Sequence, residues 1–340
     1  MYDQNTIIRD LRVLTEQFIP SKIIHRDSQI STIRDDLSPF LKNKPARNIF
    51  LYGPPGSGKT SLSKFIVEEL KSHIPVVSCY VNCWTSSSEF KVLYNILHDF
   101  GQVFVHRKGI PSDELLEQVK AKIKGKNCVI ILDEVDQIES DRIIYEFLSI
   151  GACLILISNK ESALFNFEER VRSRLASINY VEFPHYREFE LVDILKDRAE
   201  YGLLPHVASK ELIEKIASIS DGDSRFAIDT LRIIAEEAEK KDLTKIPLEY
   251  VDKFLAKAKT VGRNDIVSSL NPHQKLIYEI ISDAGKIKPV EFNEKLSLLC
   301  QQKKLDVVSD RSIRNYLEKL EHYKLIKLLG DGKGRTYSVL

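Results

Sequence analysis

The sequence predicts an α/β fold with a parallel sheet, followed by an all-helical region and a small C-terminal unit of helices and a hairpin. Three observations support this fold class. Apolar stretches alternate with helical patterns between residues 49 and 183, residues 187–258 carry helical patterns only, and two alternating stretches flank a turn sequence at residues 331–334. Strands that are apolar along nearly their whole length are typical of a parallel sheet covered on both faces.

The predicted elements follow one another along the chain. Residues 1–48 are expected to form a short helix and then a second helix after Asp27. Five strands are expected at "NIFLY", "PVVSCYVN", "CVIILDEVD", "CLILISN" and "NYVEF", with helices between them at residues 61–73, 87–101, 112–124 and 140–149. Further helices are expected at residues 187–201, 209–219, 223–240 and 247–258, and the charged stretch "KAKTVGRNDIVSSL" is expected to be a linker.

The composition is that of an ordinary soluble globular protein. The chain has 340 residues, of which 43% are hydrophobic and 29% charged, enough for two or three domains. The net charge of +1 means that any basic surface for nucleic acid must be local. No apolar run is long enough to span a membrane and the N-terminus lacks the apolar core of a signal peptide, so we expect a cytoplasmic protein. The five cysteines lack C-x-x-C spacing, which predicts buried free thiols and no zinc site.

The stretch "LYGPPGSGKT" carries the clearest chemical signal. Its glycines at positions 53, 56 and 58, followed by Lys59 and Thr60, fit the phosphate-binding pattern G-x-x-x-x-G-K-[ST]. Glycines let the backbone N–H groups point at phosphate oxygens, and the positive end of the next helix faces the same anion. Lys59 would reach the β- and γ-phosphates, and Thr60 would offer its hydroxyl to Mg²⁺.

Polar side chains end two of the predicted strands. Asp133 and Glu134 follow "VIIL", at the edge of a parallel sheet where ligands bind. We expect Asp133 to hold Mg²⁺ and Glu134 to polarise the water that attacks the γ-phosphate. Asn159 ends the next strand, where its amide could bind that water or the γ-phosphate.

The C-terminal stretch has three helical patterns and a hairpin signal, which is the element order of a winged helix. Ser309 is the expected cap of the third helix, whose apolar residues repeat at helical spacing. The candidates for DNA contact are the polar residues of this helix and of the hairpin tip: Arg311, Arg314, Asn315, Lys319, Lys333 and Arg335. The alternative is a winged helix used for protein contacts.

These motifs together resemble the AAA+ ATPases. "GPPGSGKT", "LDEVD", a polar residue ending the next strand, "VRSRL" and "GDSR" in a helical lid occur in that order. Within this class the chain is similar to the origin-recognition/cell-division-cycle initiator family of archaea and eukaryotes, on the stretches "FIPSKIIHRDSQI", "YVNCW", "VEFPHY", "LVDILKDRAEYGL" and "GDSRFAIDTLR". The resemblance covers essentially the whole chain. It implies an AAA+ parallel-sheet nucleotide-binding domain at residues 1–186, an all-helical lid at 187–262 and a winged-helix DNA-binding domain at 263–340.

The resemblance also implies roles for individual residues. Asn159 matches sensor 1, Arg225 matches sensor 2, and Arg174 matches the arginine finger that serves a neighbouring subunit, with Arg172 as the fallback. The segment before the phosphate loop lines the adenine pocket in this family. The residues expected at the ATP or ADP are Ile23, Ile24, His25, Arg26, Gly53, Pro54, Pro55, Gly56, Ser57, Gly58, Lys59, Thr60, Ser61, Tyr186 and Arg225.

The function implied by the resemblance is that of a replication initiator. It would bind double-stranded origin DNA, hydrolyse ATP slowly as a switch, and support loading of the replicative helicase. The resemblance also implies that the protein is associated with the chromosome and that other initiator paralogues are among its candidate partners. The alternatives are a clamp-loader-like or remodelling motor, and a signalling NTPase that uses its winged helix for protein contacts. A motor would be favoured by a pore-loop aromatic pair or a clamp-interaction module, and the sequence has neither.

Overall fold

The computed structural model describes residues 6–101, 110–255, 270–303, 305, 309–322, 325–329 and 336–339. The chain divides into two compact units, Met1–Val251 and Asp252–Leu340, which are described one after the other. The finer division into three domains stays a prediction.

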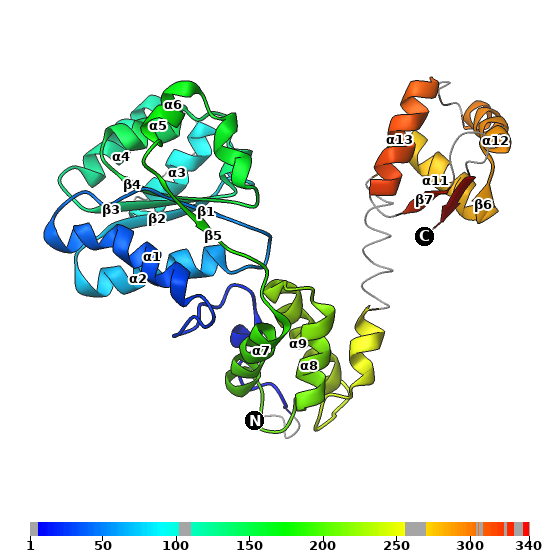
Figure 1. Ribbon diagram of the computed structural model, residues 1–340, viewed down its shortest axis with the longest axis horizontal. Helices are drawn as coiled ribbons and strands as arrows, with labels where there is room; N and C mark the ends of the chain where they lie inside the picture. The colour runs from blue at the N-terminus through cyan, green and yellow to red at the C-terminus, as the bar shows by residue number, and fades with distance from the viewer. Residues whose placement is uncertain are drawn as a thin grey trace. The chain divides into compact units, whose positions relative to one another are not determined.

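The first unit is built on a five-stranded sheet (Figure 1). Its strands are β1 Ile49–Tyr52, β2 Val77–Asn82, β3 Cys128–Asp133, β4 Cys153–Ser158 and β5 Asn179–Glu182. The spatial order is β2-β3-β4-β1-β5, and every neighbouring pair is parallel. The predicted parallel sheet is confirmed. All the carboxyl ends therefore lie at one edge, next to the phosphate loop that follows β1.

Helices cover both faces of this sheet (Figure 1). One face carries α1 Asp27–Leu37 and α2 Lys59–His73, and the other carries α3 Glu89–Asp99, α4 Ser112–Ile123, α5 Arg142–Ser149 and α6 Glu169–Arg174. Strand side chains alternate between the two cores, since Phe50 packs in one and its neighbours Ile49 and Leu51 pack in the other. The strands are thus covered on both sides, as their continuous apolar pattern predicted.

Three local features differ from the sequence prediction. Helix α2 begins at Lys59 instead of residue 61, because the phosphate loop turns directly into the helix. Strand β3 ends at Asp133, because Glu134 has a left-handed backbone with a φ of 53° and cannot continue the strand. Helix α6, which carries the three arginines of "RVRSR", was not predicted as a helix.

A helical bundle follows the sheet within the first unit. It contains α7 Glu188–Gly202, α8 Lys210–Ile219 and α9 Ser224–Glu239. A further helix, which the structure describes over residues 249–255, includes the boundary between the two units at Val251. The short 3-10 helix Leu11–Leu14 near the N-terminus packs against α7 and α9, where Leu14 fits over Gly202 so closely that a β-carbon there would overlap it. The N-terminal segment is therefore packed on the lid helices.

The second unit has the predicted order of a winged helix. It contains α11 Pro272–Ala284, β6 Lys286–Ile287, α12 Pro289–Gln302, α13 Asp310–His322, β7 Ile326–Leu329 and β8 Thr336–Val339. The strands form an antiparallel sheet in the order β6-β8-β7, of which β6 was not predicted. The Ser309 hydroxyl accepts a hydrogen bond from the Ser312 N–H at 3.3 Å, as expected of a helix cap. The hairpin tip, residues 330–335, lies outside the described residues.

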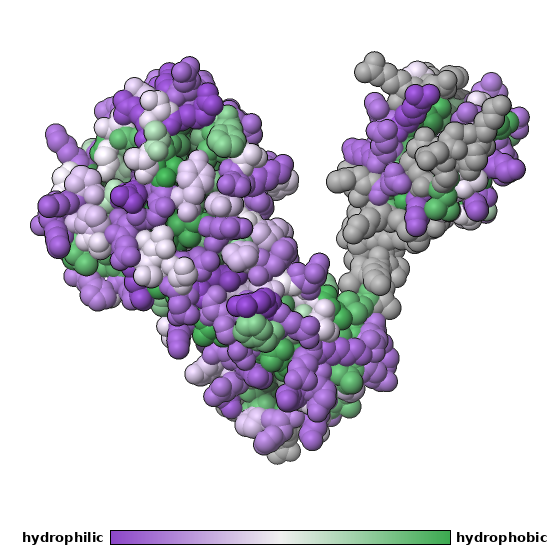
Figure 2. Space-filling model, in the orientation of Figure 1, coloured by the Kyte–Doolittle hydropathy of each residue, from purple (hydrophilic) through white to green (hydrophobic). Residues whose placement is uncertain are grey.

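On the face drawn in Figure 2, hydrophobic residues form small patches among hydrophilic ones. Among the described helices none is long and apolar enough to cross a membrane. All five cysteines are buried and free, as predicted.

Candidate nucleotide-binding site

The phosphate loop needs glycine at three positions. Gly53, Gly56 and Gly58 all have a positive φ, of 138°, 69° and 94°. Space is restricted as well, because a β-carbon at Gly53 would overlap the carbonyl group of Phe183, and one at Gly58 would lie 2.6 Å from the Tyr186 hydroxyl. The predicted irregular backbone is thus combined with close approach of neighbouring segments.

Lys59 lies at the centre of the loop and is only 6% exposed. Its ammonium group donates to the carbonyl oxygens of Gly53 at 2.6 Å and Pro54 at 2.8 Å, and to Asn159 Oδ1 at 3.1 Å. Burial lowers the pKa of Lys59 to about 8, and the nearby Asp133 carboxylate opposes part of that shift. The structure therefore brings together Lys59 and the predicted sensor residue Asn159, which are 100 positions apart in the sequence.

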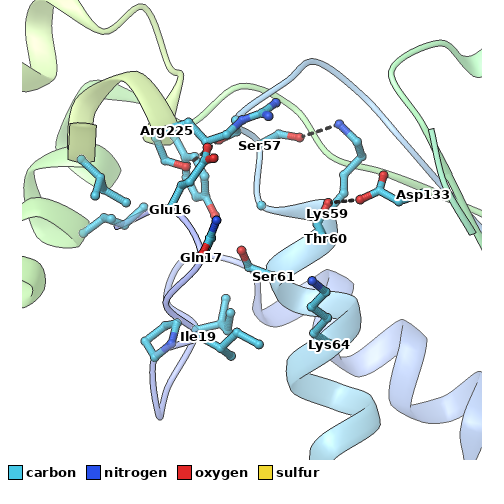
Figure 3. Close-up of a pocket in the computed structure, with 18 of the residues that line it drawn as sticks. Glu16, Gln17, Ile19, Ser57, Lys59, Thr60, Ser61, Lys64, Asp133 and Arg225 are labelled. Atoms are coloured by element: carbon cyan, nitrogen blue, oxygen red, sulfur yellow. Dashed lines mark hydrogen bonds between the residues drawn. The ribbon is translucent and has the colours of Figure 1, made fainter. Parts of the chain in front are cut away.

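Thr60 and Asp133 meet at the edge of the sheet. The Thr60 hydroxyl donates to Asp133 Oδ2 at 2.6 Å, and the Tyr80 hydroxyl donates to the same oxygen at 2.9 Å (Figure 3 shows the first bond). Burial, followed by the Asp133 charge, raises the pKa of Tyr80 well above its usual range, so Tyr80 stays a neutral donor. A hydroxyl and a carboxylate are the oxygen donors that Mg²⁺ prefers, and the two predicted metal ligands fit this ion.

Glu134 follows Asp133 and has a left-handed backbone conformation. It lines a cavity beside the phosphate loop, together with Lys59 and Thr60. Partial burial raises the pKa of Glu134, and the neighbouring Asp133 charge raises it further. A carboxylate with a raised pKa is a stronger base than an exposed one. This position suits the predicted role of Glu134 in activating water.

Residues of the helical lid line this cavity on the side opposite the start of α2. The cavity has a volume of about 300 Å³, and Arg225 at the start of α9 lines it together with Lys59, Asp133, Glu134 and Asn159. Figure 3 shows Arg225 on the lid side, across from the start of α2 where Lys59 and Thr60 lie. A sensor on the sheet and a sensor on the lid thus face one space.

The predicted adenine segment divides into two parts. Ile23 and Ile24 line the cavity, as do Tyr186 and the loop residues from Gly56 to Ser61. His25 and Arg26 do not line it, and neither do Gly53, Pro54 and Pro55. His25 Nε2 lies 3.0 Å from an Asp193 carboxylate oxygen of α7, which links this segment to the lid.

Arg26 instead supports the phosphate loop from behind. It is 3% exposed, and its guanidinium donates twice to the Ser57 carbonyl oxygen, at 3.1 and 3.0 Å, and once to that of Pro184, at 2.8 Å. The guanidinium also lies 3.7 Å from the centre of the Tyr186 ring. Desolvation lowers the pKa of Arg26. The hydrogen bonds and the ring contact therefore offset the free-energy cost of burying the guanidinium charge.

Three cavity-lining residues, Ile19, Pro20 and Lys22, belong to the segment "FIPSKIIHRDSQI" that was expected at the adenine, although they were not singled out. The sequence reasoning missed the other lining residues, which come from the N-terminal segment, α2, β2 and the lid: Glu16, Gln17, Lys64, Tyr80, Asn82, Ile194, Asp197, Arg198, Ser224 and Ile228. Glu16, Gln17 and Ile19 surround the cavity with the lid residues in Figure 3. The one available signal was the helical spacing of Lys64, one turn after Thr60. Nothing local to the other positions distinguishes them from surface residues.

The predicted arginine finger lies outside this cavity. Arg170, Arg172 and Arg174 are exposed on α6. The Arg174 guanidinium donates to the Tyr145 hydroxyl at 3.0 Å and lies 4.1 Å from the centre of that ring. An exposed position is what a residue needs in order to reach a neighbouring subunit.

The DNA candidates belong to the second unit. Arg314, Asn315 and Lys319 are exposed on α13, opposite the buried Leu317 and Leu320. Arg311 lies in α13, but its side chain is outside the described part of the chain, and Lys333 and Arg335 lie outside the described residues altogether. The polar face predicted for the third helix is therefore present at three positions.

Comparison with known proteins identifies the family. Residues 42–167 match the AAA domain model and residues 192–255 match the Cdc6 AAA+ ATPase-type lid domain. The ORC1-type DNA replication protein 9 of Halobacterium salinarum is 35% identical over 340 residues, which cover 99% of this chain and 95% of the relative. The chain belongs to the ORC1-type DNA replication proteins.

Two further comparisons agree with this ORC1-type assignment. The ORC1-type DNA replication protein 1 of the same organism is 36% identical over 83% of this chain and 93% of the relative. The structure of the Aeropyrum pernix Orc1 protein in complex with DNA has a TM-score of 0.80 at 25% identity, covering 98% of this chain and 94% of that one. The predicted family, its AAA+ fold class and its activities as an ATPase and a replication initiator are confirmed.

Proposed function

We propose that this ORC1-type initiator is a nucleotide-controlled DNA-binding protein that recognises double-stranded origin DNA and supports loading of the replicative helicase. The observation that carries the proposal is the convergence of Asn159 from the sheet and Arg225 from the lid on one cavity beside Lys59. Residues from two parts of the unit can then respond to the same γ-phosphate, which is what a switch requires.

The chemistry at this cavity follows from the side chains that face it. Thr60 and Asp133 would hold Mg²⁺, which neutralises charge on the phosphates when it is bound. Lys59 balances the β- and γ-phosphates, and Glu134 takes up a proton from the attacking water. Arg174 would contact the ATP of a neighbouring subunit, so a protein acting alone would hydrolyse ATP slowly.

The DNA surface in this proposal is the exposed face of α13 with the hairpin tip. Arg314 and Asn315 can form the paired hydrogen bonds that read guanine and adenine in a major groove. Lys333 and Arg335 would contact phosphates or a minor groove, because a hairpin tip reaches across the backbone. The Aeropyrum pernix Orc1 structure is a complex with DNA, which supports the same class of partner for this chain. We also propose other initiator paralogues and the replicative helicase as partners, and membership of the ORC1-type DNA replication proteins supports this proposal.

Competition binding on origin and scrambled duplexes, across a salt series, tests this proposal. Arg314→Ala or Asn315→Ala should relax specificity at one base position, at a cost of roughly 1–3 kcal/mol. Lys333→Ala and Arg335→Ala should weaken binding to both duplexes and lower the salt slope by about one for each phosphate that is no longer neutralised. The matched control is Lys295→Ala, since this lysine of α12 is paired with Glu291 on its own helix.

The outcomes separate the alternatives. If both groups of variants weaken both duplexes equally, α13 does not read bases. If neither group changes binding, the winged helix is a protein-contact module and the DNA-binding surface lies elsewhere.

A further inference from the structure

The lid helix α9 begins in direct contact with the phosphate loop. The Ser224 hydroxyl donates to the Gly56 carbonyl oxygen at 2.7 Å, and the Ser224 N–H donates to the same oxygen at 3.2 Å. Gly56 is also in contact with Asp223, because a β-carbon at position 56 would overlap the Asp223 carboxylate. This carboxylate caps α9 by accepting from the N–H groups of Arg225 at 2.8 Å and Phe226 at 3.2 Å.

The turn that leads into α9 is held from a second side. The Tyr186 N–H donates to the Gly222 carbonyl oxygen at 3.2 Å. A β-carbon at Gly222 would lie 2.7 Å from both the Tyr186 carbonyl oxygen and the His185 β-carbon, so the turn packs tightly on this segment. The first turn of α9 is therefore fixed between the phosphate loop and the segment that joins the sheet to the lid.

We propose that Ser224 is a positioning residue that latches the lid to the phosphate loop and thereby holds Arg225 ready for the γ-phosphate. The inference rests on the proposed role of Arg225 as a γ-phosphate sensor. Arg225 is the next residue in the chain and its long side chain is exposed, so the helix start sets where the guanidinium can reach. Without the latch, contact with the γ-phosphate must also order the lid, which costs free energy on binding.

The expected effect is a lower preference for ATP over ADP. Ser224→Ala removes the hydroxyl donor and leaves the N–H donor in place. The net value of one hydrogen bond corresponds to about three- to tenfold in an equilibrium constant, so the ratio of ATP-analogue affinity to ADP affinity should fall by about this factor. Ser224→Thr keeps a hydroxyl and should restore the ratio. Ser218→Ala is the matched control, because the hydroxyl of this exposed lid serine donates to the Lys215 carbonyl oxygen of its own helix.

A double-mutant cycle in the intact chain separates positioning from general support of the fold. Isothermal titration with ADP and with a non-hydrolysable ATP analogue would be carried out on Ser224→Ala, Arg225→Ala and the double variant. We expect Ser224→Ala to have no further effect on the affinity ratio once Arg225 is absent.

Each result decides between the interpretations. If Arg225→Ala leaves the ratio of ATP-analogue affinity to ADP affinity unchanged, Arg225 is not a γ-phosphate sensor. The proposed positioning role of Ser224 then fails as well. If Arg225→Ala lowers the ratio while Ser224→Ala weakens both nucleotides equally, Ser224 only supports the loop and the latch is refuted.

Discussion

Arg26 offers a quantitative test of how the phosphate loop is supported. Its guanidinium makes three hydrogen bonds to the carbonyl oxygens of Ser57 and Pro184, donates a further one to the His25 carbonyl oxygen at 3.1 Å, and stacks on Tyr186. Arg26→Ala would leave the Ser57 oxygen buried without these donors and remove the packing on the ring. We therefore expect the variant to be less stable and to bind nucleotide more weakly.

The magnitude follows from the burial of the group. The individual hydrogen bonds cannot be summed, because desolvation of the guanidinium, which lowers the pKa of Arg26, offsets part of their value. Leaving a buried carbonyl oxygen without its donor costs about 1–3 kcal/mol, and losing the stacking on the Tyr186 ring adds about 0.5–2 kcal/mol. For a unit of this size a total loss of about 1.5–5 kcal/mol lowers the melting temperature by roughly 3–20 °C. Arg26→Lys keeps the charge but loses the planar fork, and we expect a loss of about 1–3 kcal/mol.

Urea unfolding followed by Trp84 fluorescence and by circular dichroism measures this loss, since Trp84 is the single tryptophan and lies in the first unit. Arg34→Ala is the matched control, because Arg34 forms an exposed pair with Glu69 at 2.7 Å and should contribute at most about 1 kcal/mol. The reasoning is refuted if Arg26→Ala and Arg34→Ala lower the free energy of unfolding equally.

Three further predictions concern the cavity. Glu134→Gln should keep ATP bound and abolish turnover, because the amide cannot accept the proton from water; retained hydrolysis in a phosphate-release assay would mean that another residue activates the water. Metal-free ADP affinity should fall as the pH rises above about 8, because the pKa of Lys59 is lowered to about 8 and only its protonated form balances the phosphates. Lys59→Met should bind weakly with no such slope, and a slope that persists in this variant would assign the titration to another group. Tyr80→Phe removes a donor to Asp133, and hydrolysis should then require about tenfold more Mg²⁺, as for other residues that orient a metal ligand; an unchanged Mg²⁺ titration would show that Thr60 alone orients the carboxylate.

The sequence by itself determined the chemistry that is encoded locally. The phosphate loop depends on glycines and a lysine at fixed spacing, so Gly53, Gly58 and Lys59 identify it without any tertiary information. The strands of the sheet are covered on both faces, and their apolar runs therefore stood out along the chain. Asp133 could be placed for the same reason, since parallel strands bring their carboxyl ends to one edge.

Only the tertiary structure decided which distant residues support that chemistry. Arg26 precedes the loop in the sequence, as an adenine-pocket residue does, yet the fold places it behind the loop on Ser57. Tyr80 and Ser224 look like ordinary strand and helix-start residues, and their partners Asp133 and Gly56 lie 53 and 168 positions away. A hydrogen bond depends on where two groups meet in space, and sequence spacing carries no record of that when the groups belong to separate elements. Local sequence patterns therefore identified the residues expected to face the phosphates. The residues that hold these in position could be identified only from how the lid and the N-terminal segment pack against the phosphate loop.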